Sequence, residues 1–221
     1  MTWKALLRIG LYTLVLAAVF FLSSGRLDCI AAWAYLGILT VNTCIIFSLV
    51  DPELLEERGQ FRRHARPWDL AILILIAQVG PAAMLLVSGL DIRFAWSDPV
   101  PPVLRAAAFA AMVLGLLLGD WAMLSNRFFS AIVRIQKERG HTVVTTGPYR
   151  IVRHPGYLGA ILHSFALPLL LGSVWGLMPA AVVVVGILVR TIVEDRVLRA
   201  QLEGYPEYAR RVRFRLLPGV W

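Results

Sequence analysis

The stretch that decides how this chain is organised is TTGPYRIVRHPGYLGAI, residues 145–161, in which charged and aromatic residues stand directly before an apolar run. Pro155 disfavours a helical conformation at His154 and is itself well suited to the first position of a helix. The stretch therefore predicts a helix that begins at Pro155, with polar side chains gathered before its N-terminus. The unpaired N–H groups and partial positive charge of such a terminus favour an anion.

Two glycines early in this predicted helix, Gly156 and Gly159, leave room for a ligand or for a neighbouring helix. A plainer interpretation of the whole stretch is a capped helix whose arginines face lipid headgroups, because Arg and Tyr are common at membrane interfaces. Residue types alone do not separate such an anchor from a binding site.

The composition of the chain excludes an ordinary soluble domain. Of the 221 residues, 58% are hydrophobic and only 16% are charged, whereas soluble domains carry about 25% charged residues. The net charge of +8 comes from Lys and Arg that lie between apolar runs and form no separate basic domain, so nucleic acid is not an expected partner. Cys29 and Cys44 offer neither a disulfide framework nor metal-ligand spacing, so we expect buried thiols and no metal site.

Six apolar runs predict an all-α polytopic membrane protein with about six transmembrane helices. The runs are Ala5–Leu22, Ile30–Val50, Leu70–Leu90, Val103–Leu124, Tyr157–Gly172 and Leu177–Val193. A full span needs about 20 residues, and the fifth run reaches only about 24 Å of an apolar layer about 30 Å thick. We therefore expect it to form a tight hairpin with the sixth run through GSVWG, residues 172–176. The first run imitates a signal peptide, but no A-x-A cleavage pattern follows it, so an uncleaved helix is expected.

The chain shows no internal repeat and no second soluble domain, so residues 1–221 are expected to form one integral-membrane domain. Residues 1–124 would be a four-helix scaffold, and residues 125–221 would carry the functional motifs. Within the scaffold, Gly115 and Gly119 form the G-x-x-x-G pattern that is typical of close helix packing.

Basic residues predict the orientation of these helices in the membrane. If both termini are cytoplasmic, the inside segments hold Lys4, Arg8, Arg58, Arg62, Arg63, Arg66, Arg127, Arg134, Lys137, Arg139, Arg150, Arg153 and all the arginines from Arg190 onward. Only Arg26, Arg93 and Arg105 would lie outside. Since Lys and Arg collect on the cytoplasmic side of membrane proteins, this distribution predicts that the Asn126–Pro155 loop and the C-terminal tail are both cytoplasmic.

A second polar group, RTIVED at residues 190–195, ends the sixth apolar run. Arg190 and Glu194 are four residues apart and share one helix face, so they can form an intrahelical salt bridge, as can Asp195 with Arg199. Thirteen uncharged residues precede the pair, which places it near membrane depth, where ionisable groups are costly and often functional. Asp120 and His163 are also embedded, and each fits a packing group as well as a site residue.

These motifs together resemble the integral-membrane methyltransferases of the isoprenylcysteine carboxyl methyltransferase family. The resemblance rests on RIQKERGHTVVTTGPYRIVRHPGYLG, residues 134–159, on RTIVED and on YPEYARRVRFRLLP, residues 205–218. Phospholipid N-methyltransferases share parts of the pattern, and membrane sterol reductases share it more distantly. Two positions depart from the family: Asp195 replaces a second glutamate, which leaves its role open, and Gln201-Leu202 replaces a Phe-Gly, which puts the tail contacts in doubt.

The resemblance implies a cytoplasmic pocket for S-adenosylmethionine, formed by the last helical hairpin, the loop before it and the C-terminal tail, with a lipophilic acceptor that arrives from the membrane lipids. The implied cofactor contacts are Gln136, His141, Thr142, Val143, Val144, Tyr149, His154, Pro155, Gly156, Tyr157 and Glu194. Arg190 would hold the acceptor, and Arg190 and Glu194 are the candidate catalytic residues.

The chemistry of the residues agrees with this implied role. No G-x-G-x-x-G occurs, so the soluble dinucleotide-binding fold is absent. Arg190 can grip a carboxylate with two donors, which favours carboxyl O-methylation over methylation of a phospholipid amine. Two further alternatives are a membrane reductase that uses NADPH and a small transporter gated by the Arg190–Glu194 pair. Neither repeated halves nor paired broken helices support the transporter.

Overall fold

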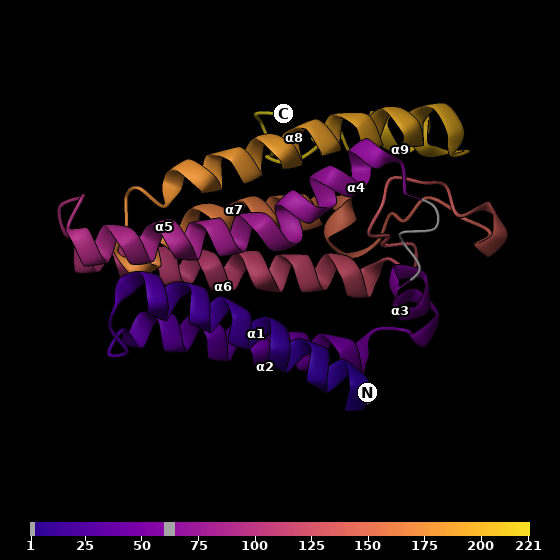
Figure 1. Cartoon of the computed structure of the whole chain (residues 1–221). Helices are drawn as coiled ribbons and strands as arrows, with labels where there is room; N and C mark the ends of the chain where they lie inside the picture. The colour runs from indigo at the N-terminus through magenta and orange to yellow at the C-terminus, as the bar shows by residue number, and fades with distance from the viewer. Residues whose placement is uncertain (1–2, 60–64) are drawn as a thin grey trace.

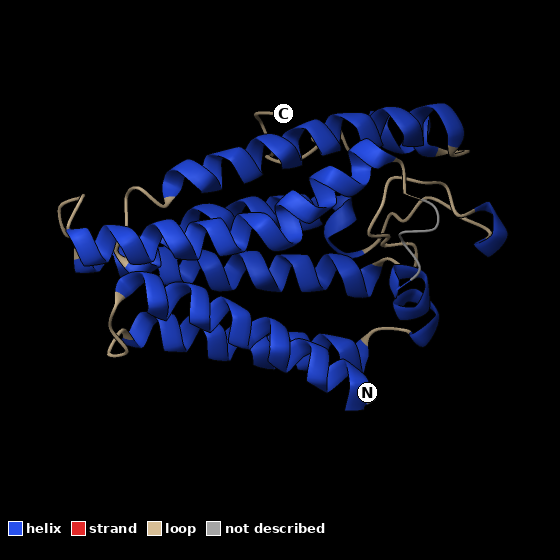
Figure 2. Ribbon diagram, in the orientation of Figure 1, coloured by secondary structure: helices blue, strands red, loops and turns tan. Residues whose placement is uncertain are grey.

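The computed structural model describes residues 3–59 and 65–221, and within these ranges every regular element is a helix (Figure 2). The long helices are α1 (Trp3–Ser24), α2 (Ile30–Leu49), α5 (Gly80–Phe94), α6 (Pro102–Ser125), α7 (Pro155–Leu171) and α8 (Leu177–Gln201). The shorter ones are α3 (Pro52–Gly59), α4 (Pro67–Ile74) and α9 (Tyr205–Arg211). The predicted all-α fold class is confirmed.

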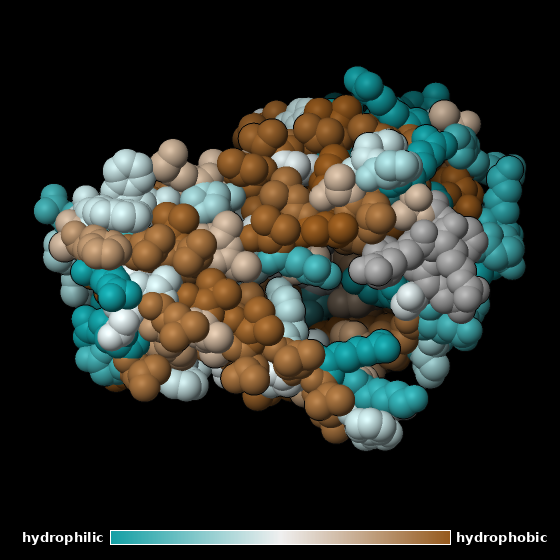
Figure 3. All heavy atoms as spheres, in the orientation of Figure 1, coloured by the Kyte–Doolittle hydropathy of each residue, from teal (hydrophilic) through white to brown (hydrophobic). Residues whose placement is uncertain are grey.

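Among the described residues, five helical segments are long and apolar enough to cross a membrane, namely α1, α2, the continuous segment Pro67–Phe94, α6 and α8. The sixth, α7, has 17 residues and is shorter than a full span, as the sequence predicts. Figure 1 shows the long helices lying side by side in one bundle, and Figure 3 shows apolar side chains over its middle with hydrophilic ones toward its ends. This surface is what a bundle embedded in lipid requires.

A π-helical turn, Leu75–Val79, joins α4 to α5 and has an identifiable cause. Pro81 follows directly, and a proline inside a helix cannot donate to the carbonyl four residues earlier, which here belongs to Ala77. Tyr12 of α1 donates its hydroxyl to this oxygen at 3.0 Å. The Ala77 carbonyl in the irregular turn therefore finds its hydrogen-bond donor on a neighbouring helix, as backbone groups at membrane depth require.

The core draws buried residues from α1, α2, α5, α6, α7 and α8, so the two halves of the chain share it. Its closest helix contact is between α6 and α7. A Cβ atom at Gly159 would lie 2.4 Å from the carbonyl oxygen of Gly115, and one at Gly115 would lie 2.6 Å from that of Gly159. The G-x-x-x-G pattern therefore serves helix packing through Gly115, with Gly119 facing the same glycine of α7.

The α7–α8 hairpin is fixed at the end of the bundle opposite the C-terminal part of α8. Gly172 ends α7 in the left-handed conformation at φ +91°, which glycine adopts without strain. Asp91 of α5 then accepts hydrogen bonds from Ser173 Oγ at 2.6 Å and from the Trp175 backbone N–H at 3.3 Å. The predicted tight turn through residues 172–176 is confirmed, and it sets the height at which α8 begins.

Candidate active site

A cavity of about 320 Å³ lies where the loop between α6 and α7 meets the C-terminal part of α8 and α9. The last helical hairpin and the preceding loop supply most of its wall, as expected. The first half of the chain contributes as well, through Arg58 of α3 and through Leu73, Ile76 and Ala77 of the α4 segment. The predicted scaffold thus also shapes the site.

Ten of the twelve residues that the sequence singled out line this cavity: His141, Thr142, Val143, Val144, Tyr149, His154, Gly156, Tyr157, Arg190 and Glu194. The other two, Gln136 and Pro155, lie outside its wall. Gln136 is fully buried, where it donates to the Phe128 carbonyl at 2.9 Å and accepts a hydrogen bond from Arg139. The structure therefore gives Gln136 the task of holding the loop, and gives Pro155 that of starting α7.

An aromatic ring packs against the first turn of α7. A Cβ atom at Gly156 would lie 2.9 Å from the ring of Phe129, so this glycine makes room for Phe129. Gly159 makes room for α6, as described above. The two glycines therefore serve packing within the protein.

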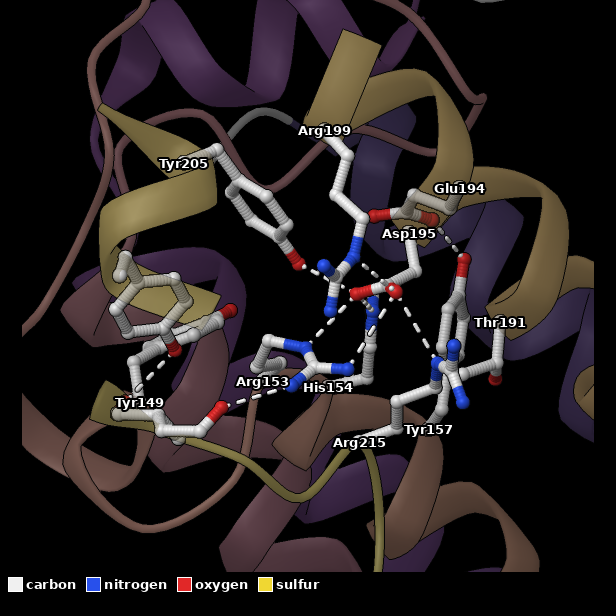
Figure 4. A network of polar contacts seen from close by, with 12 residues as sticks. Tyr149, Arg153, His154, Tyr157, Thr191, Glu194, Asp195, Arg199, Tyr205 and Arg215 are labelled. Atoms are coloured by element: carbon white, nitrogen blue, oxygen red, sulfur yellow. Dashed lines mark hydrogen bonds and ion pairs between the residues drawn. The ribbon is translucent and has the colours of Figure 1, made fainter. Parts of the chain in front are cut away.

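Glu194 presents a carboxylate to the cavity from α8. Its Oε2 accepts a hydrogen bond of 2.5 Å from the hydroxyl of Tyr157, on α7 (Figure 4). It forms no ion pair with any Lys, Arg or His in the described part of the chain. An ionised carboxylate at a cavity wall without a cationic protein partner suits a cationic ligand group.

Arg190 lies one turn before Glu194 but faces a different partner. It is buried, and its Nη2 lies 3.3 Å from Oδ1 of Asp69 on α4 and donates to the Ala131 carbonyl. The alternative of an intrahelical Arg190–Glu194 salt bridge is therefore wrong. The Nε atom of Arg190 is buried and has no hydrogen-bond partner within the described residues, so the guanidinium keeps donor capacity on the cavity wall.

Asp69 is a site residue that sequence reasoning missed. It is 1% exposed, and its Oδ2 accepts a 2.7 Å hydrogen bond from the backbone N–H of Val133. Asp69 thereby connects α4 both to Arg190 and to the loop between α6 and α7, called the cavity loop below. Its only signal in the sequence is an acidic residue two positions after Pro67, which normally indicates the first turn of a helix and nothing more.

Asp195 is the centre of a buried polar network beside the cavity (Figure 4). Its two oxygens lie within hydrogen-bond distance of three arginines and a tyrosine: Arg153 Nε at 2.8 Å, Arg199 Nε at 3.0 Å, Arg215 Nε at 3.1 Å and the Tyr205 hydroxyl at 3.0 Å. The predicted Asp195–Arg199 pair is among them. His154 Nε2 lies 3.6 Å from the same carboxylate, so His154 faces this network although its side chain also lines the cavity.

The C-terminal tail is held against the stretch that opens α7. The backbone N–H groups of Arg153 and His154 donate to the Phe214 and Arg215 carbonyls at 3.0 and 2.9 Å. The guanidinium of Arg153 also donates to two tail carbonyls. Leu202, at one of the positions that depart from the family, is buried with Tyr205 and Tyr208 and lines the cavity. The departure therefore leaves the packing of the tail intact.

The cavity loop supplies a neutral histidine. His141 stacks on Phe128 with ring centroids 4.5 Å apart, and its Nδ1 accepts a hydrogen bond from the Gln136 backbone N–H at 3.2 Å. Burial lowers the pKa of His141 from its ordinary value. The imidazole therefore adds a flat, uncharged surface to the wall. Burial likewise raises the pKa of Tyr149, which stays a phenol at neutral pH.

Asp120 and His163, which the sequence left unassigned, lie away from the cavity. Asn42 donates to Asp120 at 3.3 Å, and the ring of Tyr35 lies 5.7 Å from that of His163. Both act as contacts between α2 and the α6–α7 pair. No group of three or more potential metal ligands occurs among the described residues.

Comparison with known proteins shows what the region around this site is similar to. Residues 103–203 match the phospholipid methyltransferase family. The chain is 33% identical to protein-S-isoprenylcysteine O-methyltransferase B of Arabidopsis thaliana over 104 residues, which cover 46% of this chain and 53% of the relative. It is 35% identical to the Schizosaccharomyces pombe isoprenylcysteine O-methyltransferase over 72 residues, 32% of this chain and 30% of the relative. It is 37% identical over 109 residues, 45% of this chain and 46% of the relative, to the cobalt-zinc-cadmium resistance protein CzcN of Cupriavidus metallidurans.

The fold and the site define a polytopic helical membrane protein whose residues 103–203, from α6 into the turn after α8, match the phospholipid methyltransferase family model. Within that family, the chain is similar to isoprenylcysteine O-methyltransferases, which confirms the resemblance seen in its motifs. The chain spans about half or less of the length of these relatives. The activity, substrates and partners of the whole protein are therefore matters for proposal.

Proposed function

We propose that the chain is an S-adenosylmethionine-dependent methyltransferase that methylates the carboxylate of a lipophilic acceptor, an isoprenylcysteine or another lipid acid. The cofactor has a carboxylate, an ammonium, an adenine and a sulfonium, and the cavity has side chains that suit them. The observation that carries the proposal is Glu194, a carboxylate on the cavity wall whose hydrogen-bond partner among the described residues is the neutral Tyr157. A sulfonium or ammonium group of the bound cofactor would be the positively charged partner that Glu194 lacks among the described residues.

The proposed cofactor end of the cavity is the one formed by the cavity loop, α8 and α9. His141 to Val144 and the rings of Tyr205 and Tyr208 line it. Val143 packs with the buried cluster of α9, so the loop stays close to that helix. Aromatic and apolar walls of this kind bury adenine and stabilise a nearby cation.

The proposed acceptor end is the one formed by α4 and by Arg190. Leu73, Ile76 and Ala77 give it an apolar wall that suits a lipid chain. The bound cofactor supplies a methyl group on a sulfonium, and a carboxylate acceptor is already ionised at neutral pH, so no residue has to remove a proton. The protein's task is to hold the acceptor oxygen in line with the methyl group, which the directed donors of Arg190 can do.

A phospholipid amine is the second candidate acceptor, because the matching family is named for phospholipid methylation. An amine must lose a proton before it can be methylated, and Arg190 on the wall, a donor without an acceptor, cannot take that proton. These features favour the carboxylate. A reductase would bind NADPH in place of S-adenosylmethionine, and a transporter would move a solute without either.

The proposal is tested by incubating the purified protein in lipid nanodiscs with methyl-labelled S-adenosylmethionine and a lipid extract, and then identifying the labelled product. We expect label in an acidic lipid or isoprenoid fraction. A protein that binds NADPH but not S-adenosylmethionine, or one that gives solute flux in proteoliposomes without either cofactor, would contradict the proposal.

Replacing Arg190 with lysine should separate acceptor alignment from cofactor binding. Lysine keeps the positive charge opposite Asp69 but loses the planar set of donors. We therefore expect the dissociation constant for S-adenosylmethionine to stay within about twofold, while kcat falls by about 10²-fold because alignment is lost. Calorimetric titration and a turnover assay measure the two quantities. Equal losses in both would assign Arg190 a structural role.

We also propose that residues 1–221 act as one membrane domain with both termini and the cavity in the cytoplasm. The basic count supports this orientation, although two of its members, Arg62 and Arg63, lie outside the described residues. The test is a cysteine introduced at Asp98 and, separately, one at Lys137, both in a background without Cys29 and Cys44. We expect a membrane-impermeant thiol reagent to label position 98 in intact cells and position 137 only after the cells are opened. The reverse pattern would invert the topology.

A further inference from the structure

Within the described residues, four guanidinium groups line the cavity, and three of them have a carboxylate partner. Arg134 pairs with Glu57 at 3.1 Å and with Glu138 at 2.7 Å. Arg153 pairs with Asp195 at 2.8 Å, and Arg190 with Asp69 at 3.3 Å. The fourth, Arg58, forms no ion pair with any carboxylate among the residues that the structure describes. Its nearest compensating charge is Glu57, which acts on Arg58 without an ion-pair contact and is itself paired with Arg134.

Arg58 is fixed at the cavity by one hydrogen bond and one aromatic ring. It ends the short helix α3, whose start is capped by Asp51 accepting the Glu53 N–H at 2.8 Å. Its Nη1 donates to the Phe129 carbonyl at 3.1 Å, and its Cζ lies 5.5 Å from the centroid of the Phe129 ring. Among the described residues, Phe129 is the one that accepts a hydrogen bond from this guanidinium, which has five N–H donors.

This position is costly for a cation. The side chain is half-buried, and burial lowers the pKa of the Arg58 guanidinium from its ordinary value. An arginine nevertheless stays charged at neutral pH. A charge withdrawn from water needs a counter-charge, and where the protein supplies none at contact distance a ligand is the natural source.

Arg58 lies toward the end of the cavity that we assign to the acceptor. It shares Phe129 with the start of α7, and the same loop continues to Ala131 and Val133, which bind Arg190 and Asp69. The cofactor end, with Val143 against α9, is formed by the other part of the loop. Arg190 offers donors but has its charge balanced by Asp69, whereas Arg58 offers net charge.

We infer that Arg58 binds the carboxylate of the acceptor and makes the cavity selective for acidic lipids over neutral ones. This inference rests on the proposed function and extends it to a residue outside the stretch that matches the family, residues 103–203. In this arrangement the positive charge of Arg58 attracts the acceptor carboxylate, and the directed N–H donors of Arg190 orient it.

The test compares two probes that differ only in charge, N-acetyl-S-farnesylcysteine and its carboxamide. Binding of each probe and of S-adenosylmethionine is measured on the full chain in nanodiscs for the unchanged protein, Arg58→Gln, Arg58→Lys and the control Arg66→Gln. Arg66 is exposed and lies outside the cavity. Thermal melting checks that each variant is folded. If Arg58→Gln does not fold, Arg58→Lys takes its place in the comparison.

We expect the unchanged protein and Arg66→Gln to bind the acid at least about tenfold more tightly than the amide, a difference of about 1.4 kcal/mol. Arg58→Gln should lose this preference, and Arg58→Lys should keep part of it, with S-adenosylmethionine binding unchanged within about twofold in both. Weaker binding of S-adenosylmethionine in Arg58→Gln, with the acid preference intact, would overturn the inference because Arg58 would then serve the cofactor. An Arg58→Gln protein that keeps both the preference for the acid and the affinity for S-adenosylmethionine would also overturn the inference. If the unchanged protein binds S-adenosylmethionine but shows no acid preference, the carboxylate acceptor itself is refuted.

Discussion

Replacement of Glu194 with glutamine is expected to weaken S-adenosylmethionine binding by about tenfold to a hundredfold, the equivalent of about 1.5–3 kcal/mol for a hydrogen bond to a charged group. The substitution keeps the shape of the side chain and removes the negative charge that the cavity wall presents to a cationic ligand. The hydrogen bond from Tyr157, 2.5 Å long in the unchanged protein, can still be made to the amide oxygen, so the fold should survive.

Calorimetric titration of Glu194→Gln and of the control Glu203→Gln measures this effect. Glu203 is exposed and lies outside the cavity wall, so its variant should bind the cofactor as the unchanged protein does. An unaltered affinity in a folded Glu194→Gln protein would remove the cation-binding role from Glu194. Tyr157→Phe should give an intermediate loss, since it frees the carboxylate but leaves its charge.

Replacement of Asp195 with asparagine is expected to destabilise the protein by about 3–5 kcal/mol, because it leaves the buried guanidinium of Arg153 without its counter-charge. Asp195 is 1% exposed and holds arginines from α8, from the start of α7 and from the C-terminal tail. The loss should release the tail from the stretch before α7 and open the cavity. Stability and cofactor binding are therefore expected to fall together.

Thermal denaturation in detergent, followed by limited proteolysis of the tail, checks this expectation. Asp98→Asn is the matched control, since Asp98 is exposed near the opposite end of the bundle. Faster cleavage after Arg210 or Arg211 in Asp195→Asn alone would show that the tail has been released. A variant that melts and resists protease like Asp98→Asn would show that the arginines do not depend on Asp195.

The sequence predicted the helices well because their signals are local. Apolar runs, the start at Pro155 and the turn after Gly172 each depend on neighbouring residues, and the structure confirms them. The local spacing of Gly115 and Gly119 also predicted close helix packing, and the structure shows that the partner is α7. The π turn before Pro81 was not predicted, although the proline that causes it is visible in the sequence.

The partners of the site residues could not be predicted in the same way. Arg190 and Glu194 are one turn apart and oppositely charged, so local rules favour a bond between them. The fold separates them by bringing Asp69 from α4 to one and Tyr157 from α7 to the other. Asp69 lies far from Arg190 in the chain, and no local pattern marks it as a partner.

Gln136 and Arg58 also show that local sequence does not predict the role of a side chain in the cavity. Gln136 stands within a motif that the family uses, yet here it lies behind the cavity wall and bonds to the loop backbone. Arg58 stands outside every motif, and its place in the cavity follows from the packing of α3 against the loop at Phe129. Side-chain roles of this kind depend on tertiary contacts that only the folded chain makes.

The central claim, that the cavity methylates a carboxylate, is tested most directly by the chemical nature of the transferred label. The protein in nanodiscs is incubated with methyl-labelled S-adenosylmethionine and N-acetyl-S-farnesylcysteine, and the extracted lipid is treated with alkali. A methyl ester is hydrolysed by alkali and releases its label as volatile methanol, whereas an N-methyl group stays with the lipid. We predict that nearly all the label transferred by the unchanged protein is released, and that Glu194→Gln transfers far less. Label that resists alkali, or that appears only in amine-containing lipids of an added extract, would contradict the claim.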